Sequence, residues 1–182
     1  MSKSRERWVI KAGSSLVAGN DDGINKLFIK NLVLQVSQLL EEGIQVIIVS
    51  SGAVAKGMHE LNLNERPDSL NLLQAAAAIG QLGLIDSYKS EFSNFEIKTA
   101  QVLISQDDIA NRERYLNARN SLMTLLELGV VPIINENDSV STEEISFGDN
   151  DTLAGAIGGL TDADKFIMLT DEQGVFSQDP KK

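Results

Sequence analysis

Short apolar runs alternate with segments of helical periodicity along the whole chain, and this alternation constrains the fold more than any other feature. Five runs have strand character, at residues 8–12, 46–49, 97–104, 130–134 and 165–169. Segments typical of helices lie between them, at residues 25–42, 70–92, 112–129 and 151–159. Strands joined by helices pair in parallel, and the helices pack on both faces of the sheet. We therefore predict an α/β fold, a three-layer αβα sandwich around a mostly parallel, open sheet.

The composition is that of an ordinary globular protein, and it excludes several kinds of site. A length of 182 residues fits one domain with a sizeable core. The formal net charge of −10 argues against nucleic acid or an anionic membrane surface as a partner. Because the chain contains no cysteine, disulfides, zinc–thiolate sites and cysteine nucleophiles are excluded. The one histidine, His59, lies in a polar stretch and is expected to be a solvated surface residue.

The sequence shows no pattern of a membrane span or an export signal. No run reaches about 18 consecutive apolar residues, the length that a spanning helix needs. The first seven residues carry charge, but no apolar run of signal-peptide length follows them. We therefore expect a cytoplasmic protein.

Polar groups begin where the first two apolar runs end. Lys11 lies inside the run 8–12, where a lysine is rare because its charge must be paired or reach a ligand. Gly13 and two serines follow at once, so a ligand could approach the backbone closely. After the run 46–49, residues 50–52 (SSG) would open a helix whose free N–H groups form an anion site. The alternatives are a plain turn beside an edge lysine and a simple serine N-cap.

The most unusual stretch follows the run 130–134. It consists of two clusters of acids and amides, 135–138 (NEND) and 148–151 (GDND), and the second opens directly into a helix. We predict a short hairpin or excursion at 141–147, between the clusters. Carboxylates and amides are poor core material, but they suit a small ligand that carries both an ammonium and carboxylates. For the second cluster, 148–151, a calcium loop is the competing interpretation, although the spaced ligands and the later bidentate glutamate of such a loop are missing.

These polar groups are expected to meet at one edge of the sheet. The carboxyl ends of parallel strands share an edge, and ligands of open α/β sheets bind beyond it. Lys11 and the glycine-containing turns favour phosphate, whereas the acid–amide clusters favour an amino acid. We therefore predict phosphoryl transfer from a nucleotide to a small amino-acid-like acceptor. A carboxylate acceptor is already ionised at neutral pH, so no general base is required. Lysine and Mg²⁺ would neutralise charge on the transferred group.

The same stretches resemble the amino acid kinase family, and within it the glutamate 5-kinases. The motifs that carry the resemblance are residues 9–15 (VIKAGSS), 49–57 (VSSGAVAKG), 111–119 (NRERYLNAR), 132–140 (PIINENDSV), 148–151 (GDND) and 169–171 (LTD), with Gly174 and the pair Asp179-Pro180. The resemblance covers essentially all 182 residues, and the combination of motifs is specific.

The resemblance implies an ATP-dependent kinase that converts the γ-carboxylate of L-glutamate to L-glutamyl 5-phosphate, the first step of proline biosynthesis. ATP and Mg²⁺ are the implied cofactors, and L-glutamate is the implied substrate. Lys11 would contact the transferred phosphoryl group, and Asp151 would orient the catalytic lysines. The implied nucleotide-side residues are Lys11, Gly13, Ser14, Thr170 and Asp171. The implied glutamate-binding residues are Ser51, Asn135, Asp138, Asp149 and Asn150.

The family's catalytic domain is longer than this chain. We therefore expect residues 1–182 to be an amino acid kinase domain truncated at its C-terminus, with the acceptor-binding part and only the start of the nucleotide-binding part. Such a chain could be inactive alone. The polar loop 59–69 corresponds to the family's proline-feedback region, which implies inhibition by proline. Gly80 and Gly83 in the helix 70–92 indicate close packing, against the sheet or a second subunit, and we expect a homo-oligomer. The alternatives are a sibling kinase acting on acetylglutamate or aspartate, and a non-catalytic amino-acid-binding fragment.

Overall fold

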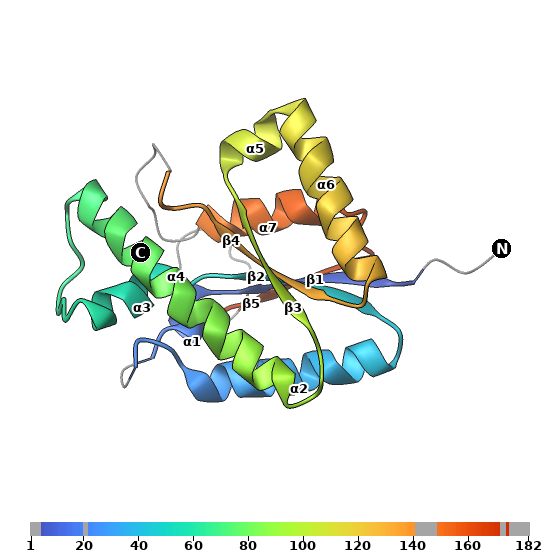
Figure 1. Ribbon diagram of the computed structural model, residues 1–182, viewed down its shortest axis with the longest axis horizontal. Helices are drawn as coiled ribbons and strands as arrows, with labels where there is room; N and C mark the ends of the chain where they lie inside the picture. Colours follow the sequence, from blue (N-terminus) through green and yellow to red (C-terminus); the bar gives the residue numbers. More distant parts are fainter. Residues whose placement is uncertain (1–4, 20–21, 141–148, 172–173, 175–182) are drawn as a thin grey trace.

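The computed structural model describes residues 5–19, 22–140, 149–171 and 174. These residues build one sheet of five parallel strands in the order β3-β4-β2-β1-β5 (Figure 1). The strands are β1 (Arg7–Ala12), β2 (Gln45–Ser50), β3 (Thr99–Ile104), β4 (Val131–Glu136) and β5 (Lys165–Leu169). The predicted parallel α/β sheet is therefore confirmed.

Helices cover both faces of this sheet. Helices α2 (Lys26–Glu41) and α4 (Leu70–Ser93) lie on one side, and α6 (Arg112–Glu127) and α7 (Asp149–Leu160) on the other (Figure 1). Successive residues of a strand face opposite sides, so Ile10 and Ile48 belong to the first core, with α2 and α4. Val9 and Ile47 belong to the second core, with α6 and α7. The three-layer prediction is confirmed.

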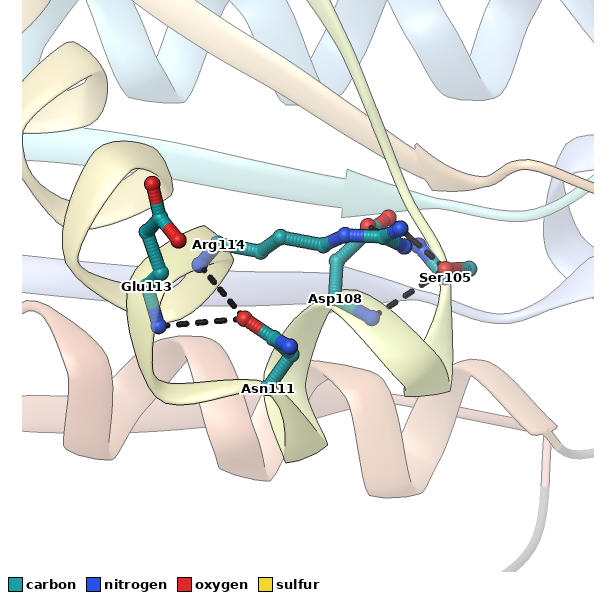
Figure 2. A network of polar contacts seen from close by, with 5 residues as sticks. All are labelled: Ser105, Asp108, Asn111, Glu113 and Arg114. Atoms are coloured by element: carbon teal, nitrogen blue, oxygen red, sulfur yellow. Dashed lines mark hydrogen bonds and ion pairs between the residues drawn. The ribbon is translucent and has the colours of Figure 1, made fainter.

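A separate short helix, α5 (Gln106–Ala110), lies between β3 and α6 and was not predicted. Local side chains hold it, as Figure 2 shows. Ser105 and Asp108 form a capping box, in which each side chain bonds the other residue's backbone N–H. The side chain of Asn111 then accepts hydrogen bonds from the first N–H groups of α6. The caps at Ser105 and Asn111 therefore begin two separate helices, α5 and α6.

Three boundaries differ from the prediction at the functionally interesting end of the sheet. β4 continues through Asn135 and Glu136, which are buried, and α7 begins at Asp149 rather than at Asp151. Helix α3 (Ala53–Glu60) starts after Gly52, which has a φ of +110° and makes no side-chain cap. The serine N-cap alternative is therefore wrong, while a helix N-terminus at this strand end is confirmed. The hairpin predicted at 141–147 lies outside the described residues.

Lys11 is not an edge lysine, because β1 lies between β2 and β5. The turn that follows it is also more ordered than a plain turn. It forms α1 (Ser14–Val17), one turn of helix whose N-cap is Gly13. The alternative of a plain turn beside an edge lysine is therefore wrong.

The glycines of α4 pack on another helix, not on the sheet. A Cβ atom added at Gly80 would lie 1.9 Å from the Ala53 carbonyl oxygen and 2.9 Å from the Cα of Gly57, both in α3. A Cβ atom added at Gly83 would lie 2.5 Å from the side chain of Lys56, again in α3. The predicted close packing is thus present, but its partner within the described chain is α3.

Helix α3 is also tied to the chain that precedes α2. Lys56 is buried, and its Nζ lies 2.6 Å from Asp22 Oδ1 and 3.4 Å from Glu60 Oε1. Asp22 Oδ2 lies 2.8 Å from Lys26 Nζ. Hydrogen bonds from Lys26 and Lys56 lower the pKa of Asp22 from 3.8 to about 2.

No helix within the described ranges combines the length and the apolar character that crossing a membrane requires.

The Asp22 cluster predicts a pH-dependent stability. A carboxylate whose pKa is lowered on folding stabilises the native state above its unfolded pKa and loses that effect as the pH falls through its folded pKa. Asp22→Asn should therefore cost about 1–2 kcal/mol at pH 7, a value reduced for the partial exposure of Asp22. Roughly half of the difference should remain at pH 3, between the two pKa values. Urea unfolding of both proteins at the two pH values measures it.

Asp162→Asn is the matched control for this experiment. Asp162 pairs with Arg119 at 2.6 Å, but its side chain is 74% exposed. Such a surface pair contributes little, so this change should shift the unfolding free energy by less than about 0.5 kcal/mol. A difference between wild type and Asp22→Asn that stays constant from pH 7 to pH 3 would contradict the prediction.

Candidate acceptor and phosphate site

A cleft of about 620 Å³ lies at the carboxyl edge of the sheet. Its walls come from the turn after β1, the turn after β2, the end of β4 and the start of α7. The polar lining includes Ser14, Ser51, Asn135, Glu136, Asp138 and Asn150. Parallel pairing is what gathers these groups, because each strand ends at the same edge.

Lys11 and Asp151 form an ion pair beside this cleft. Lys11 Nζ lies 2.5 Å from Asp151 Oδ1, and the lysine side chain is only 8% exposed. Asp151 is 44% exposed and belongs to the first turn of α7. A buried ammonium is stable only when it is paired, so α7 supplies the counter-charge that lets the strand carry a lysine. The pair leaves the ammonium fixed at the edge of the sheet.

Gly13 keeps the space in front of Lys11 open. A Cβ atom added at Gly13 would lie 3.3 Å from Lys11 Nζ and 3.2 Å from the Leu169 carbonyl oxygen. The Gly13 N–H donates to that same carbonyl at 3.2 Å, which ties the turn to the end of β5. A larger residue at position 13 would therefore crowd the lysine that any phosphate would approach.

An amide network joins the ends of β2 and β4 to α7. Asn150 Nδ2 donates to Ser51 Oγ at 2.8 Å and to Asn135 Oδ1 at 3.0 Å. Asn135 Oδ1 also accepts from the Glu136 N–H at 2.9 Å, and Asn135 Nδ2 donates to Gln81 Oε1 at 2.8 Å. Four elements distant in the sequence, the end of β2, α4, β4 and α7, are thus held together by directed hydrogen bonds.

The end of β5 joins the same edge through a side-chain contact. Ser15 Oγ donates to Asp171 Oδ1 at 2.7 Å, and Thr170 is the residue between β5 and Asp171. The turn after β1 therefore lies between the cleft on one side and the residues after β5 on the other.

The structure thus brings together most of the residues singled out in the sequence. Ser14, Ser51, Asn135, Asp138 and Asn150 line one cleft, and Lys11 and Asp151 pair beside it. Asp149 opens α7, but its side chain lies outside what the structure describes. Of the predicted calcium loop 148–151, Gly148 and the side chain of Asp149 lie outside the described residues, whereas Asn150 donates to its neighbours and Asp151 pairs with Lys11. Within the described ranges, no three His, Asp or Glu side chains form a group that could hold a metal ion.

Several residues at or near the cleft were not predicted as site residues. Glu136 is buried and lines the cleft, and its place in the cluster 135–138 was the signal. His59 is exposed, as expected, yet it also lines the cleft from the end of α3. Gln81 lies in the middle of α4 and had no local signal, because only the fold brings α4 to β4.

Sequence comparison identifies the family of the chain. The model of the amino acid kinase family matches residues 6–182. The chain belongs to the amino acid kinase family. Three relatives of this chain are named glutamate 5-kinase. They come from Paraburkholderia phymatum (53% identical), Hydrogenovibrio crunogenus (52%) and Alcanivorax borkumensis (51%), and the matches cover 97–98% of this chain and 47% of each relative. The chain thus spans about half the length of these amino acid kinases.

Proposed function

We propose that residues 1–182 form the acceptor-binding part, and the start of the nucleotide-binding part, of a kinase that makes L-glutamyl 5-phosphate from L-glutamate and ATP. The observation that carries the proposal is the Lys11–Asp151 pair, held next to a cleft whose lining includes two acids and three asparagines. The names of the relatives, glutamate 5-kinase, support the choice of acceptor.

In the proposed reaction an oxygen of the γ-carboxylate attacks the γ-phosphorus of ATP. The bond from that phosphorus to the bridging oxygen of ADP breaks, and the products are ADP and L-glutamyl 5-phosphate. The attacking carboxylate is ionised at neutral pH, so no base has to remove a proton. The protein's work is therefore to position the two substrates and to neutralise charge on the transferred group.

Lys11 would place its ammonium against the transferred phosphoryl group, and Asp151 would hold that ammonium in place. Gly13 and Ser14 would lie against the phosphates, and Thr170 and Asp171 would line the nucleotide site. Mg²⁺ would arrive with ATP, because such ions are bound mainly by phosphates, waters and one or two carboxylates. Because Gly13 has no side chain to crowd the Lys11 ammonium, a phosphate could approach it there.

The acceptor would lie against Ser51, Asn135, Asp138, Asp149 and Asn150. In this arrangement Asp138 pairs with the α-ammonium, while the Ser51 hydroxyl and the N-terminus of α3 receive carboxylates. We extend the proposal to feedback inhibition by proline through the loop 59–69, to a homo-oligomer and to a cytoplasmic location. The resemblance to the glutamate 5-kinases supports these three points, and the absence of cysteine suits a reducing compartment.

A hydroxylamine-trapping assay tests the function. L-Glutamate, ATP, Mg²⁺ and hydroxylamine are incubated with this chain, and separately with a protein that extends it to the length of its relatives. We expect glutamyl hydroxamate from the extended protein and little or none from the 182-residue chain. L-Aspartate and N-acetyl-L-glutamate should give none. An extended protein that binds glutamate but forms no hydroxamate would favour the alternative of a non-catalytic amino-acid-binding module.

Asp138→Asn should separate acceptor from nucleotide binding. Removing the charge that faces an ammonium costs about 1.5–3 kcal/mol, so the KM for glutamate should rise about 10- to 100-fold in the extended protein. The KM for ATP should change less than about twofold. Asp107→Asn is the control, because Asp107 is exposed in α5 and does not line the cleft. If the KM for ATP rises more than that for glutamate, Asp138 does not belong to the acceptor site.

A further inference from the structure

Gln81 is a buried polar residue of α4 that neither the motifs nor the cleft lining single out. It is 7% exposed and lies among small residues, two of which, Ala77 and Gly80, are also buried. Its Oε1 accepts a hydrogen bond from Asn135 Nδ2 at 2.8 Å. This bond satisfies the oxygen of the buried amide, whereas Gln81 Nε2 is buried and has no partner among the described residues.

The orientation of the amides in this network is fixed from the backbone. The N–H of Glu136 can only donate, so the atom of Asn135 that lies 2.9 Å from it must be the oxygen. The other atom of that amide is then the nitrogen, which donates to Gln81. The atom of Asn150 that faces Asn135 Oδ1 must also be a nitrogen. Asn150 therefore donates to Asn135, and Asn135 donates to Gln81, so the network runs in one direction and ends at an acceptor.

This order leaves a hydrogen-bond acceptor at the cleft end of the network. Asn150 Nδ2 donates hydrogen bonds to Ser51 Oγ and Asn135 Oδ1. Asn150 Oδ1, by contrast, is buried and has no partner among the described residues. Hydrogen bonds in a chain polarise one another, so each donation toward Gln81 makes the oxygen of Asn150 a stronger acceptor. A buried acceptor without a donor is unfavourable in the empty site and is satisfied by a ligand N–H.

We propose that Gln81 is a positioning residue of the acceptor site. By accepting from Asn135, it holds Asn135 and through it Asn150, so that Asn150 Oδ1 receives a hydrogen bond from the α-ammonium of the acceptor. The inference rests on the proposed function. It also narrows the acceptor class to free amino acids, because a des-amino or N-acylated analogue offers no ammonium to that oxygen.

The first test needs no ligand and uses this chain. Side-chain NH₂ signals of Asn135 and Asn150 are followed by NMR in wild type, Gln81→Met and Gln81→Glu. Methionine has a similar shape but cannot accept the bond, so hydrogen exchange at both amides should speed up about tenfold. Glutamate keeps an acceptor oxygen, and burial keeps its new carboxyl protonated, so exchange should stay near wild type. Gln35→Met, at an exposed position of α2, is the control. Unchanged exchange in Gln81→Met overturns the proposal.

The second test asks whether the effect reaches the ammonium. L-Glutamate and glutarate, which lacks the amino group, are titrated into the same proteins. Gln81→Met should weaken the binding of L-glutamate about tenfold and that of glutarate less than twofold. Gln81→Glu should keep the wild-type preference for L-glutamate over glutarate. Equal losses for both ligands would overturn the ammonium role.

The two tests also separate the inference from the function on which it rests. Wild-type chain that binds neither ligand would count against the proposed function and the ammonium role. The exchange measurement would still decide whether Gln81 holds Asn150. Should Gln81→Met fail to fold, Gln81→Glu still decides, because loss of its preference for L-glutamate over glutarate would contradict the proposal.

Discussion

Replacing Lys11 with methionine is expected to lower kcat by about a hundred- to a thousandfold in a protein that extends this chain to the length of its relatives. The proposed reaction has no proton to move, so most of its acceleration must come from charges placed against the transferred phosphoryl group. In the proposed site that charge is Lys11, which lies in β1 and pairs with Asp151. Methionine keeps most of the volume of the side chain but removes the charge.

The fold should survive this change, because Asp151 is partly exposed and can be hydrated once its partner is gone. Steady-state kinetics of the extended protein and circular dichroism of the 182-residue chain give the two measurements. Lys165→Met is the matched control. Lys165 is also a strand lysine, but it begins β5, at the sheet edge opposite the cleft, where it pairs with Glu6 and lies over Trp8. That variant should keep kcat within about twofold, and a near-normal kcat for Lys11→Met would remove Lys11 from the mechanism.

Gly80→Ala should destabilise the chain by at least about 3 kcal/mol. The new methyl group would lie 1.9 Å from the Ala53 carbonyl oxygen and 2.3 Å from the Gly57 nitrogen. Both atoms belong to the backbone of α3, so no side chain can rotate to make room. The two helices must separate instead, and buried contacts along their whole interface weaken. Urea denaturation of the 182-residue chain measures the loss.

Gly155→Ala is the control for the helix itself. Gly155 is exposed in α7, and nothing lies within 4 Å of a Cβ atom added there. Because alanine favours a helix more than glycine does, this variant should be about 1 kcal/mol more stable than wild type. If Gly80→Ala is as stable as wild type, the tight α3–α4 contact does not exist in solution.

The sequence predicted the sheet well because burial on both faces leaves a plain signature. A continuous apolar run such as 46–49, with helices before and after it, is typical of a strand buried on both faces of a parallel sheet. The shared edge of the strand ends followed from parallel pairing alone, and the polar residues after β1, β2 and β4 do lie around one cleft. What each of those residues does in a reaction remains a prediction.

Most contacts that the sequence did not predict have one physical cause. They join residues that are distant in the chain. Gly80 could be identified as a packing glycine, but not that α3 would be its partner. Nothing near Gln81 indicates that it faces Asn135, because the contact exists only once α4 crosses the end of β4. The exception is α5, whose capping box at Ser105 and Asp108 was present in the sequence and was overlooked.

The place of β1 in the sheet also determines when the site can form. A chain emerges from the ribosome with its N-terminus first, and β1 can pair with β2 early. Its other neighbour, β5, and the acid that pairs with Lys11 are synthesised far later. Closing such long loops is slow, so these contacts belong to the last stage of folding. Until then the lysine stays in water. The sheet is thus completed in a late step, and a nascent chain that stops short of β5 would leave one side of β1 unpaired.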